Sequence, residues 1–241
     1  MRNSIRMIAV AAALCAGQIT TAQAEFTASQ KDELNKLFET YIKENPLVVR
    51  DALIALADNE AKERRSQAMA MVALDEGDPS MGAGDEADIV IYEFSDYNCG
   101  YCKRVFTQIQ SVLEDDPKVR LTLKEYPILA ESSVMAARAG IAAGMQGKFE
   151  PFHVGMMNWR GEITMDAILS IAEDGGIDTT QLQADMASEA TENILQRTRA
   201  TAQALEVSGT PALIIGDEFV PGAISAEQIK QIIQEQRDAA S

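Results

Sequence analysis

Two cysteines lie three positions apart in the stretch SDYNCGYCKR, residues 95–104, as Cys99-Gly100-Tyr101-Cys102. This spacing occurs in zinc sites, in structural disulfides and in redox centres. A zinc site needs four ligands, but the chain has only this one C-x-x-C and a single histidine, His153. A disulfide across so short a loop would remove little entropy from the unfolded chain. The residue types and their spacing therefore favour a redox centre.

The elements around the cysteines support redox chemistry. The β-branched and aromatic run DIVIYEF, residues 88–94, predicts a buried strand, and residues 101–115 have the apolar spacing of a helix. Cys99 then lies at a helix start, where free N–H groups and the positive end of the helix dipole favour its thiolate. We expect Cys99 to be the nucleophile, and Cys102, one helical turn further, to resolve the mixed disulfide.

A second motif, VSGTPALIIG at residues 207–216, places Thr210 and Pro211 directly before a predicted strand. Proline has no N–H to donate, so it belongs at a strand start or an edge. In the cis form it would turn the neighbouring backbone groups outward, where they could pair with an extended client segment beside Cys99. The other interpretation is an ordinary loop proline before a strand.

Two charged residues fall within predicted strands. Glu93 lies six positions before Cys99, and Lys124 lies in the alternating stretch KVRLTLKEY, residues 118–126. A buried carboxylate is costly unless it is paired. We therefore expect Glu93 and Lys124 to pair beneath the cysteines, where the carboxylate could accept a proton during exchange. The alternative is that either side chain reaches solvent at a strand end.

The first 24 residues are typical of a secretory signal peptide. Arg2 and Arg6 provide the charged start, an apolar run follows, and Ala22-Gln23-Ala24 is an A-x-A cleavage site. The run is too short to span a bilayer, so we expect no membrane anchor. Cleavage would remove Cys15 and leave only the two C-x-x-C cysteines, in an exported protein whose compartment permits disulfides.

The formal net charge is −16, and loss of Arg2 and Arg6 with the signal would make it −18. Nucleic acids and anionic membrane surfaces both attract basic faces, so neither is an expected partner. His153 and the methionines of the chain are interpreted as packing residues rather than as metal ligands.

Residues 25–80 form a predicted N-terminal helical region. Residues 27–44 carry the apolar stripe of an amphipathic helix, and Asn45-Pro46 begins a second helix that we expect to reach about residue 74. These helices cannot bury their stripes alone, so they must pack on the main domain or on another copy of the chain. Residues 75–87, rich in glycine and acidic side chains, are predicted to be a linker.

Beyond the linker, the element order is β-α-β, a helical block, then β-β-α. The last strands are expected at residues 212–216 and from 219, and Ser225 is expected to cap a final helix. The helical block is interrupted at Gly147, at Gly161 and at Gly175-Gly176.

These features together resemble the DsbA-like branch of the thioredoxin superfamily. The resemblance rests on EFSDYNCGYCKR at 93–104, on the turn Gly209-Thr210-Pro211, and on the helical block between strands. It implies an α/β thioredoxin fold over residues 84–241, with a helical insertion over about 130–205.

The same resemblance implies roles for individual residues. Cys99 and Cys102 would form the redox-active disulfide, Pro211 would be cis with Thr210 contacting clients, and Glu93 with Lys124 would be the buried pair. It implies neither a metal nor a separate cofactor.

The N-terminal helices are similar to those of one subgroup, the suppressor-of-copper-sensitivity C type, in which such helices form dimers or trimers. The dipeptide Gly100-Tyr101 is similar to that of the dimeric periplasmic isomerases rather than to the Pro-His of the strong oxidases. The resemblance thus implies a periplasmic, oligomeric disulfide isomerase or reductase. Its partners would be client proteins with disulfides or thiols and a membrane redox partner of the DsbD or DsbB type.

Two other functions fit the same residues. One is a monomeric DsbA-type oxidase whose N-terminal helices fold back on its own domain. The other is a periplasmic carrier that binds Cu(I), for which reduced Cys99 and Cys102 would be suitable soft ligands. The sequence leaves the direction of exchange and the oligomer number open.

Overall fold

A computed structural model describes residues 26–240 of the chain. The expected signal peptide, residues 1–24, and its Cys15 lie outside the described residues. The chain divides into two units, the first ending at Ala57 and the second beginning at Asp58, and each is described by itself. None of the helices within residues 26–240 is long and apolar enough to cross a membrane.

The first unit contains helix α1 (Ala28–Glu44) and the beginning of α2 (Pro46–Val72). Thr27 starts α1 with a capping box, in which its side chain accepts from the Gln30 N–H and the Gln30 side chain accepts from the Thr27 N–H. No residue of α1 is buried, and Leu37 and Tyr41 on its apolar stripe are 66% and 51% exposed. The amphipathic helix predicted from the sequence is therefore present, with its apolar side uncovered within this unit.

The second unit contains a mixed sheet with the strand order β1-β3-β2-β4-β5. Strands β2 and β3 run parallel and are joined through helix α3 (Gly100–Asp115), while every other neighbouring pair is antiparallel. This arrangement confirms the predicted α/β thioredoxin fold. The strands are β1 (Ser80–Gly82), β2 (Ile89–Ser95), β3 (Val119–Glu125), β4 (Ala212–Ile215) and β5 (Glu218–Pro221).

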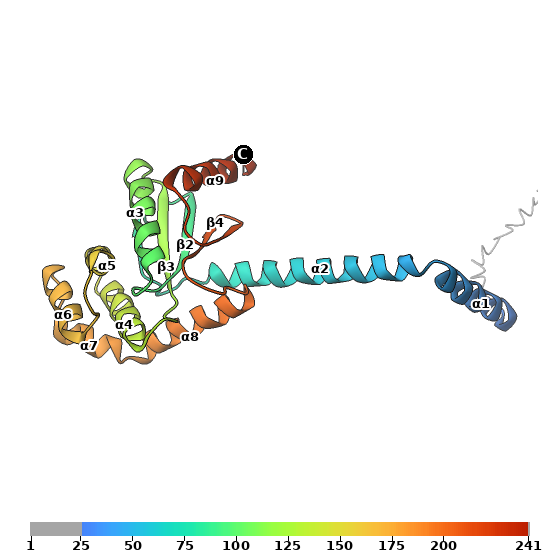
Figure 1. The fold of residues 1–241 in the computed structure, drawn as a ribbon, viewed down its shortest axis with the longest axis horizontal. Helices are drawn as coiled ribbons and strands as arrows, with labels where there is room; N and C mark the ends of the chain where they lie inside the picture. Colours follow the sequence, from blue (N-terminus) through green and yellow to red (C-terminus); the bar gives the residue numbers. More distant parts are fainter. Residues whose placement is uncertain (1–25, 241) are drawn as a thin grey trace, which may run out of the picture. The chain divides into compact units, whose positions relative to one another are not determined.

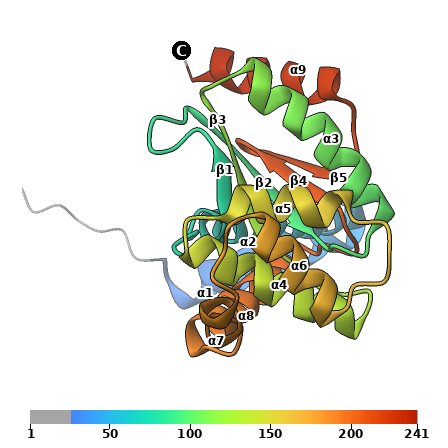
Figure 2. The same ribbon diagram turned by 90° about the vertical axis from the view of Figure 1, so that its left-hand side faces the viewer.

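The two faces of this sheet have separate hydrophobic cores. Helices α3 and α9 (Ala226–Ala239) pack against each other and cover the first face (Figures 1 and 2). The second face is covered by the C-terminal end of α2 and by α8 (Glu189–Ala204). The apolar strand residues buried on the first face include Ile91, Leu121, Leu123, Leu213 and Ile215, and the core of the second comprises Val72, Phe94, Ala202, Val207, Ala212 and Ile214.

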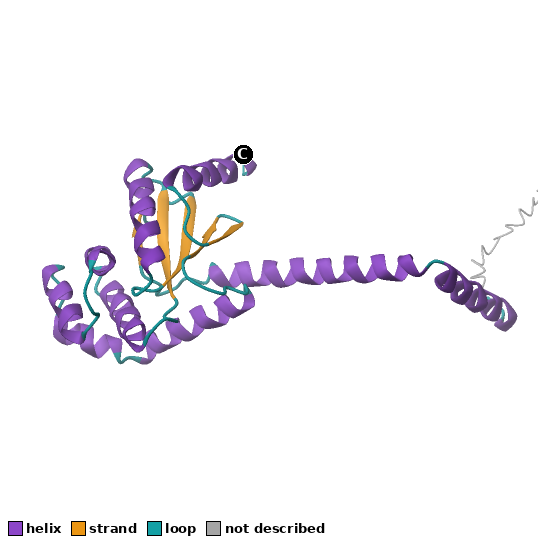
Figure 3. Ribbon diagram, in the orientation of Figure 1, coloured by secondary structure: helices purple, strands orange, loops and turns teal. Residues whose placement is uncertain are grey.

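Five helices connect β3 to β4, and Figure 3 shows this helical part beside the small sheet. They are α4 (Glu131–Met145), α5 (Phe149–Asn158), α6 (Met165–Asp174), α7 (Thr179–Met186) and α8. The breaks at Gly147, Gly161 and Gly175-Gly176 fall between helices, as the sequence predicts. Helix α5 lies close to α6 because Gly155 lacks a side chain: a Cβ there would lie 2.6 Å from a methyl group of Ile171.

The predicted linker, residues 75–87, differs from the structure. It contains β1, which pairs with β3 through the register Met81–Leu121, and Met81 is buried. A strand of three residues has too little alternation to be recognised, and the surrounding glycine and acidic residues are typical of loops. The segment is thus an edge of the sheet and part of the folded unit.

Candidate active site

Cys99 is the N-cap residue of α3, directly after the turn that follows β2. Its N–H donates to the Asp96 carbonyl at 2.9 Å, and its own carbonyl accepts from the Lys103 N–H at 3.1 Å, which begins the helix. Cys99 is 7% exposed and Cys102 is fully buried, and both are free thiols. The structure therefore places Cys99 at the helix start with Cys102 one turn deeper.

The loop before β4 brings Thr210 and Pro211 to Cys99. The Thr210–Pro211 bond is cis. The Cys99 thiol donates to the Thr210 carbonyl oxygen at 3.3 Å, across 111 positions of sequence. Strand β4 pairs with β2 so that Ala212 lies opposite Phe94, and this pairing positions the loop beside the cysteines.

Asp96 and Asn98 hold the turn between β2 and α3, and the sequence analysis did not single them out. The Asp96 carboxylate accepts from the Asn98 N–H at 2.8 Å and from the N–H groups of Ile128 and Leu129 at 2.9 and 3.0 Å. The Asn98 amide donates to the hydroxyl group of Ser133 at 2.9 Å. Aspartate and asparagine close to a strand end are typical turn residues, and this is the signal that could have revealed them.

Glu93 is fully buried on the face of β2 that is covered by α3. Burial raises its pKa from an ordinary value of 4.5 to about 8, and it has no ion-pair partner among the described residues. Burial and the nearby Glu93 raise the pKa of the Cys102 thiol. Burial therefore favours the neutral form of both groups, and the pKa of the Glu93 carboxyl group is raised to about 8.

The expected ion pair between Glu93 and Lys124 is wrong. In the parallel register Glu93 lies opposite Leu123 and Phe94 opposite Lys124. Because side chains alternate along a strand, Glu93 and Lys124 point to opposite faces of the sheet. Glu93 faces α3 and the cysteines, whereas Lys124 lies on the face covered by α2 and α8, with its Nζ 5.2 Å from the centre of the Tyr92 ring.

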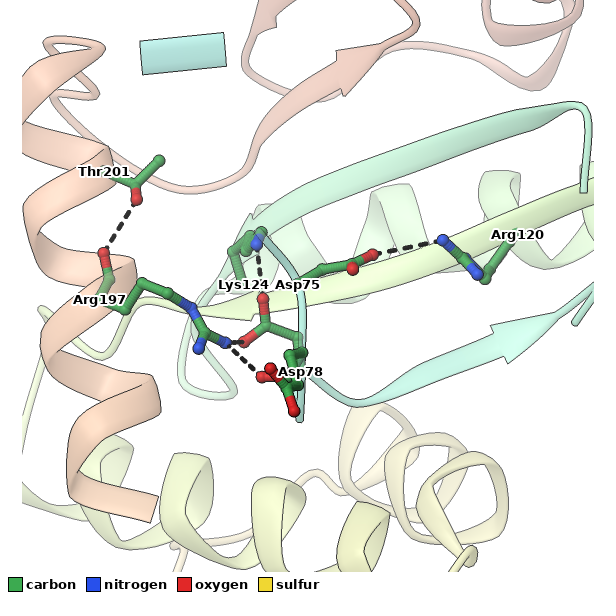
Figure 4. Close-up of polar contacts among 7 residues, drawn as sticks. Asp75, Asp78, Arg120, Lys124, Arg197 and Thr201 are labelled. Atoms are coloured by element: carbon green, nitrogen blue, oxygen red, sulfur yellow. Dashed lines mark hydrogen bonds and ion pairs between the residues drawn. The ribbon is translucent and has the colours of Figure 1, made fainter. Parts of the chain in front are cut away.

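Lys124 pairs instead with Asp78, just before β1 (Figure 4). Lys124 Nζ lies 2.5 Å from Asp78 Oδ2, and the other Asp78 oxygen accepts from Arg197 of α8 at 2.6 Å. The side chain of Asp78 is fully buried and that of Lys124 is 2% exposed. Burial lowers the pKa of Lys124, and the charge of Asp78 opposes that shift. The ion pairs of Asp78, Lys124 and Arg197 join the segment before β1, strand β3 and helix α8 on the face of the sheet opposite to Glu93.

A second buried carboxyl group, that of Glu125, lies on the same face of the sheet as Glu93. It lies beside the Tyr97 hydroxyl, and Gly140 of α4 leaves room for both: a Cβ there would lie 2.5 Å from Glu125 Oε1 and 2.9 Å from Tyr97 Oη. A hydrogen bond of 2.9 Å joins Tyr97 Oη to His153 Nδ1. Burial raises the pKa of Glu125 well above its usual range and lowers that of His153 to about 3, so His153 is neutral.

Within residues 26–240 no group of three or more histidine, cysteine, aspartate or glutamate side chains is arranged to hold a metal ion. Cys99 and Cys102 lie together as two free thiols at the start of α3. The Cys99 thiol retains a small exposed fraction beside the Thr210 carbonyl, and Cys102 is fully buried one turn deeper in α3. This arrangement suits transfer of a disulfide from one thiol pair to another.

A thioredoxin-type sheet with a C-x-x-C at the start of α3 defines the class of the thiol–disulfide oxidoreductases. The model of the DSBA-like thioredoxin domain matches residues 90–234, and the chain belongs to this family. Its members are thiol–disulfide oxidoreductases.

Three solved structures illustrate the similarity. A thioredoxin-like oxidoreductase from Silicibacter pomeroyi DSS-3 is 38% identical, covers 70% of this chain and 96% of its own, and has a TM-score of 0.66. A linker-deletion mutant of ScsC from Proteus mirabilis is 25% identical, with coverages of 90% and 100% and a TM-score of 0.66. The thiol-disulfide exchange protein alpha-DsbA2 from Wolbachia pipientis is 28% identical, with coverages of 75% and 97% and a TM-score of 0.67.

The chain spans about a quarter of the length of the curated relatives that it matches. The Na(+)/H(+) antiporter NhaA 1 of Salinispora arenicola is 24% identical over 165 residues, which are 68% of this chain and 25% of that protein. The Na(+)/H(+) antiporter NhaA of Herminiimonas arsenicoxydans is 23% identical over 156 residues, again 25% of its length.

The buried cluster on the second face gives a first prediction. Lys124→Met should lower the free energy of unfolding by about 3 kcal/mol, because it leaves Asp78 buried with Arg197 as its only remaining cation. Urea denaturation measures the change, and the exposed Lys118→Met, just before the same strand, should stay within about 0.5 kcal/mol of wild type. In the Asp78→Asn background the Lys124→Met change should cost less. A loss equal to that of Lys118→Met would contradict the pairing.

Glu93 gives a second prediction, for the reduced protein. The folded state holds the Glu93 proton up to a pH of about 8, whereas the unfolded chain loses it near 4.5. Stability from this group is therefore complete below pH 4.5 and is lost as pH rises through 8. Between pH 5 and 8.5 wild type should lose about 4 kcal/mol more than Glu93→Gln does.

Chemical denaturation at four pH values measures this difference, with the exposed Glu114→Gln of α3 as a matched control. The Glu114→Gln protein should follow the wild-type pH dependence. If Glu93→Gln does so as well, Glu93 does not carry a raised pKa.

Proposed function

We propose that this chain is an exported thiol–disulfide oxidoreductase that acts on protein disulfides through Cys99 and Cys102. The observation that carries the proposal is the position of the Cys99 thiol at the start of α3, 3.3 Å from the Thr210 carbonyl oxygen, with Cys102 buried one turn deeper. Membership of the DSBA-like family supports the same chemistry.

The exchange begins at Cys99. Its thiolate attacks one sulfur of a client disulfide. That S–S bond breaks, a Cys99–client disulfide forms, and the released client sulfur takes up a proton. Cys102 then loses its proton and attacks Cys99, which releases the second client thiol. The client gains two electrons and the chain is left with a Cys99–Cys102 disulfide.

Glu93 serves the second step in this proposal. Cys102 must lose a proton that burial and the Glu93 charge make it retain. A carboxyl group with a pKa of about 8 beside it can accept that proton when ionised and return it when the disulfide is reduced. Lys124 has no part in this step, because it lies on the opposite face of the sheet.

Thr210 and Pro211 would hold the client. The Thr210 carbonyl oxygen lies within hydrogen-bond distance of Cys99, so an extended client segment bonded to Cys99 would run alongside this loop. Backbone hydrogen bonds of this kind bind an extended segment whatever its side chains are, which suits an enzyme with many clients.

The N-terminal helices favour an oligomer that works as an isomerase or reductase. The apolar stripe of α1 is uncovered within its own unit, and burying it against other copies would recover its hydrophobic free energy. Two active sites held in one oligomer can act on two cysteines of one misfolded client. In this proposal the chain is exported to the periplasm. A membrane redox partner of the DsbD or DsbB type returns Cys99 and Cys102 to the redox state that the reaction needs.

Refolding of scrambled ribonuclease in a glutathione buffer tests the activity. The mature chain, residues 25–241, should restore ribonuclease activity, and Cys99→Ser should abolish the effect because the attacking thiol is lost. Fast oxidation of reduced ribonuclease without isomerisation would instead identify an oxidase. If neither substrate responds, Cu(I) titration of the reduced protein tests the carrier function.

Sedimentation tests the oligomer. The double variant Leu37→Asp/Tyr41→Asp places two charges on the apolar stripe and should convert a dimer or trimer to monomers that lose isomerase activity. Asn35→Asp/Thr40→Asp adds the same charges to exposed polar positions and should leave the assembly intact. These substitutions are preferable to deleting residues 25–80, since that deletion would also remove the buried Val72 and Asp78. Monomeric wild type would contradict the oligomer.

A further inference from the structure

A group of cations and aromatic rings borders the active site, and we call it the cationic rim. It consists of Tyr101, Lys103 and Arg104 from the first turns of α3 and of Trp159 and Arg160, which follow α5. Lys103 lies four positions after Cys99, a spacing that places two helical residues about 5–6 Å apart at their Cβ atoms. Lys103 therefore lies in the first turn of α3, at the end that carries the attacking thiol, and its hydrogen bond to the Trp159 carbonyl brings the segment after α5 to the same end.

The rim residues contact one another through hydrogen bonds to a backbone carbonyl and through a cation–ring contact. Lys103 Nζ donates to the Trp159 carbonyl at 2.6 Å, and Arg160 Nη1 donates to the same oxygen at 3.1 Å. Arg104 lies over the Tyr101 ring, 4.6 Å from its centre, and Tyr101 is 59% exposed. Burial and the charge of Arg160 lower the pKa of Lys103. Two cations thus converge on one carbonyl oxygen although they repel each other.

The rim contains three cations in an acidic chain, and two of them donate to one carbonyl oxygen. The formal net charge is −16, and some cations of the same unit, such as Arg120, Arg138 and Arg237, are paired with carboxylates. Across the described residues 26–240, none of the three rim cations has a carboxylate within 4.0 Å. Fixed like charges without a counter-ion attract anionic groups from outside.

The geometry points to an acidic polypeptide segment as the partner of the cationic rim: a client or redox partner with aspartate or glutamate next to its reactive cysteine. This inference rests on the proposed exchange at Cys99 and names the substrates that it would favour. When the client cysteine is bonded to Cys99, its neighbours lie over the rim, where arginine can pair with a carboxylate and Tyr101 can pack on the backbone.

Two synthetic peptides test the inference. Each is a homodimer joined by one disulfide, and the two differ only in the residues beside the cysteine, Asp-Cys-Asp in one and Asn-Cys-Asn in the other. The reduced mature chain converts each disulfide to two thiols and itself forms the Cys99–Cys102 disulfide. Acid quenching and chromatography give the rate for each peptide, and the ratio of the Asp to the Asn rate is determined for each protein.

Three proteins are compared: wild type, Arg104→Gln/Arg160→Gln, and Lys118→Gln/Lys148→Gln. The last removes the same charge beyond the far ends of α3 and α5. At low ionic strength the Asp/Asn ratio should be about fivefold lower in Arg104→Gln/Arg160→Gln than in wild type, and within about twofold of wild type in the control. The difference should shrink in 0.5 M salt because screening weakens the attraction.

Other outcomes overturn the inference in distinguishable ways. An unchanged ratio means that the rim does not recognise acidic neighbours. Equal slowing of both peptides by Arg104→Gln/Arg160→Gln means that the cations act on the Cys99 thiolate instead. An equal fall in the control means that net charge alone matters. If wild type reduces neither peptide, the proposed exchange itself fails, and the inference fails with it.

Discussion

The alternation of side chains along β2 is the constraint on which the active site depends. This strand is hydrogen-bonded on both edges, to β3 in parallel and to β4 in the antiparallel sense, so its register cannot slip without exchanging the two faces of the sheet. Glu93 is thereby fixed on the face of Cys102, and Phe94 enters the second core. The end of β2 delivers the chain to the turn at Asp96 and then to Cys99.

The buried carboxyl groups on the two faces of the sheet differ in whether a cation pairs with them. On the second face Asp78 is paired with Lys124 and Arg197, so the cost of burial is offset by short ion pairs. On the first face Glu93 and Glu125 are buried without cations, and burial raises the pKa of both. Uncompensated groups of this kind are typical of functional sites. Within residues 26–240, the buried carboxyl oxygens without a hydrogen-bond partner thus belong to Glu93 and Glu125, on the face of the sheet that carries α3.

Much of the fold could be predicted from local patterns in the sequence. Helix α3, strands β2, β3 and β4 and the breaks within the helical block lie close to their predicted places, because apolar periodicity and glycine positions act over a few residues. Strand β1 was missed, since three residues in a glycine-rich and acidic segment carry no detectable alternation. The same segment contains Asp78. Its role as the buried partner of Lys124 and Arg197 depends on the folded structure and not on its neighbours in sequence.

The sequence by itself determined the chemistry: a C-x-x-C at the start of a helix, after a buried strand, in a chain with no further cysteine pair. Tertiary structure decided which groups surround that chemistry. The contact of Cys99 with Thr210 spans 111 positions, and the contact of Lys124 with Asp78 spans 46. Such contacts depend on strand register and on which face each side chain occupies. A shift of one residue in register reverses the face. Their places in adjacent predicted strands suggested Glu93 as the partner of Lys124, and the folded sheet placed Asp78 there.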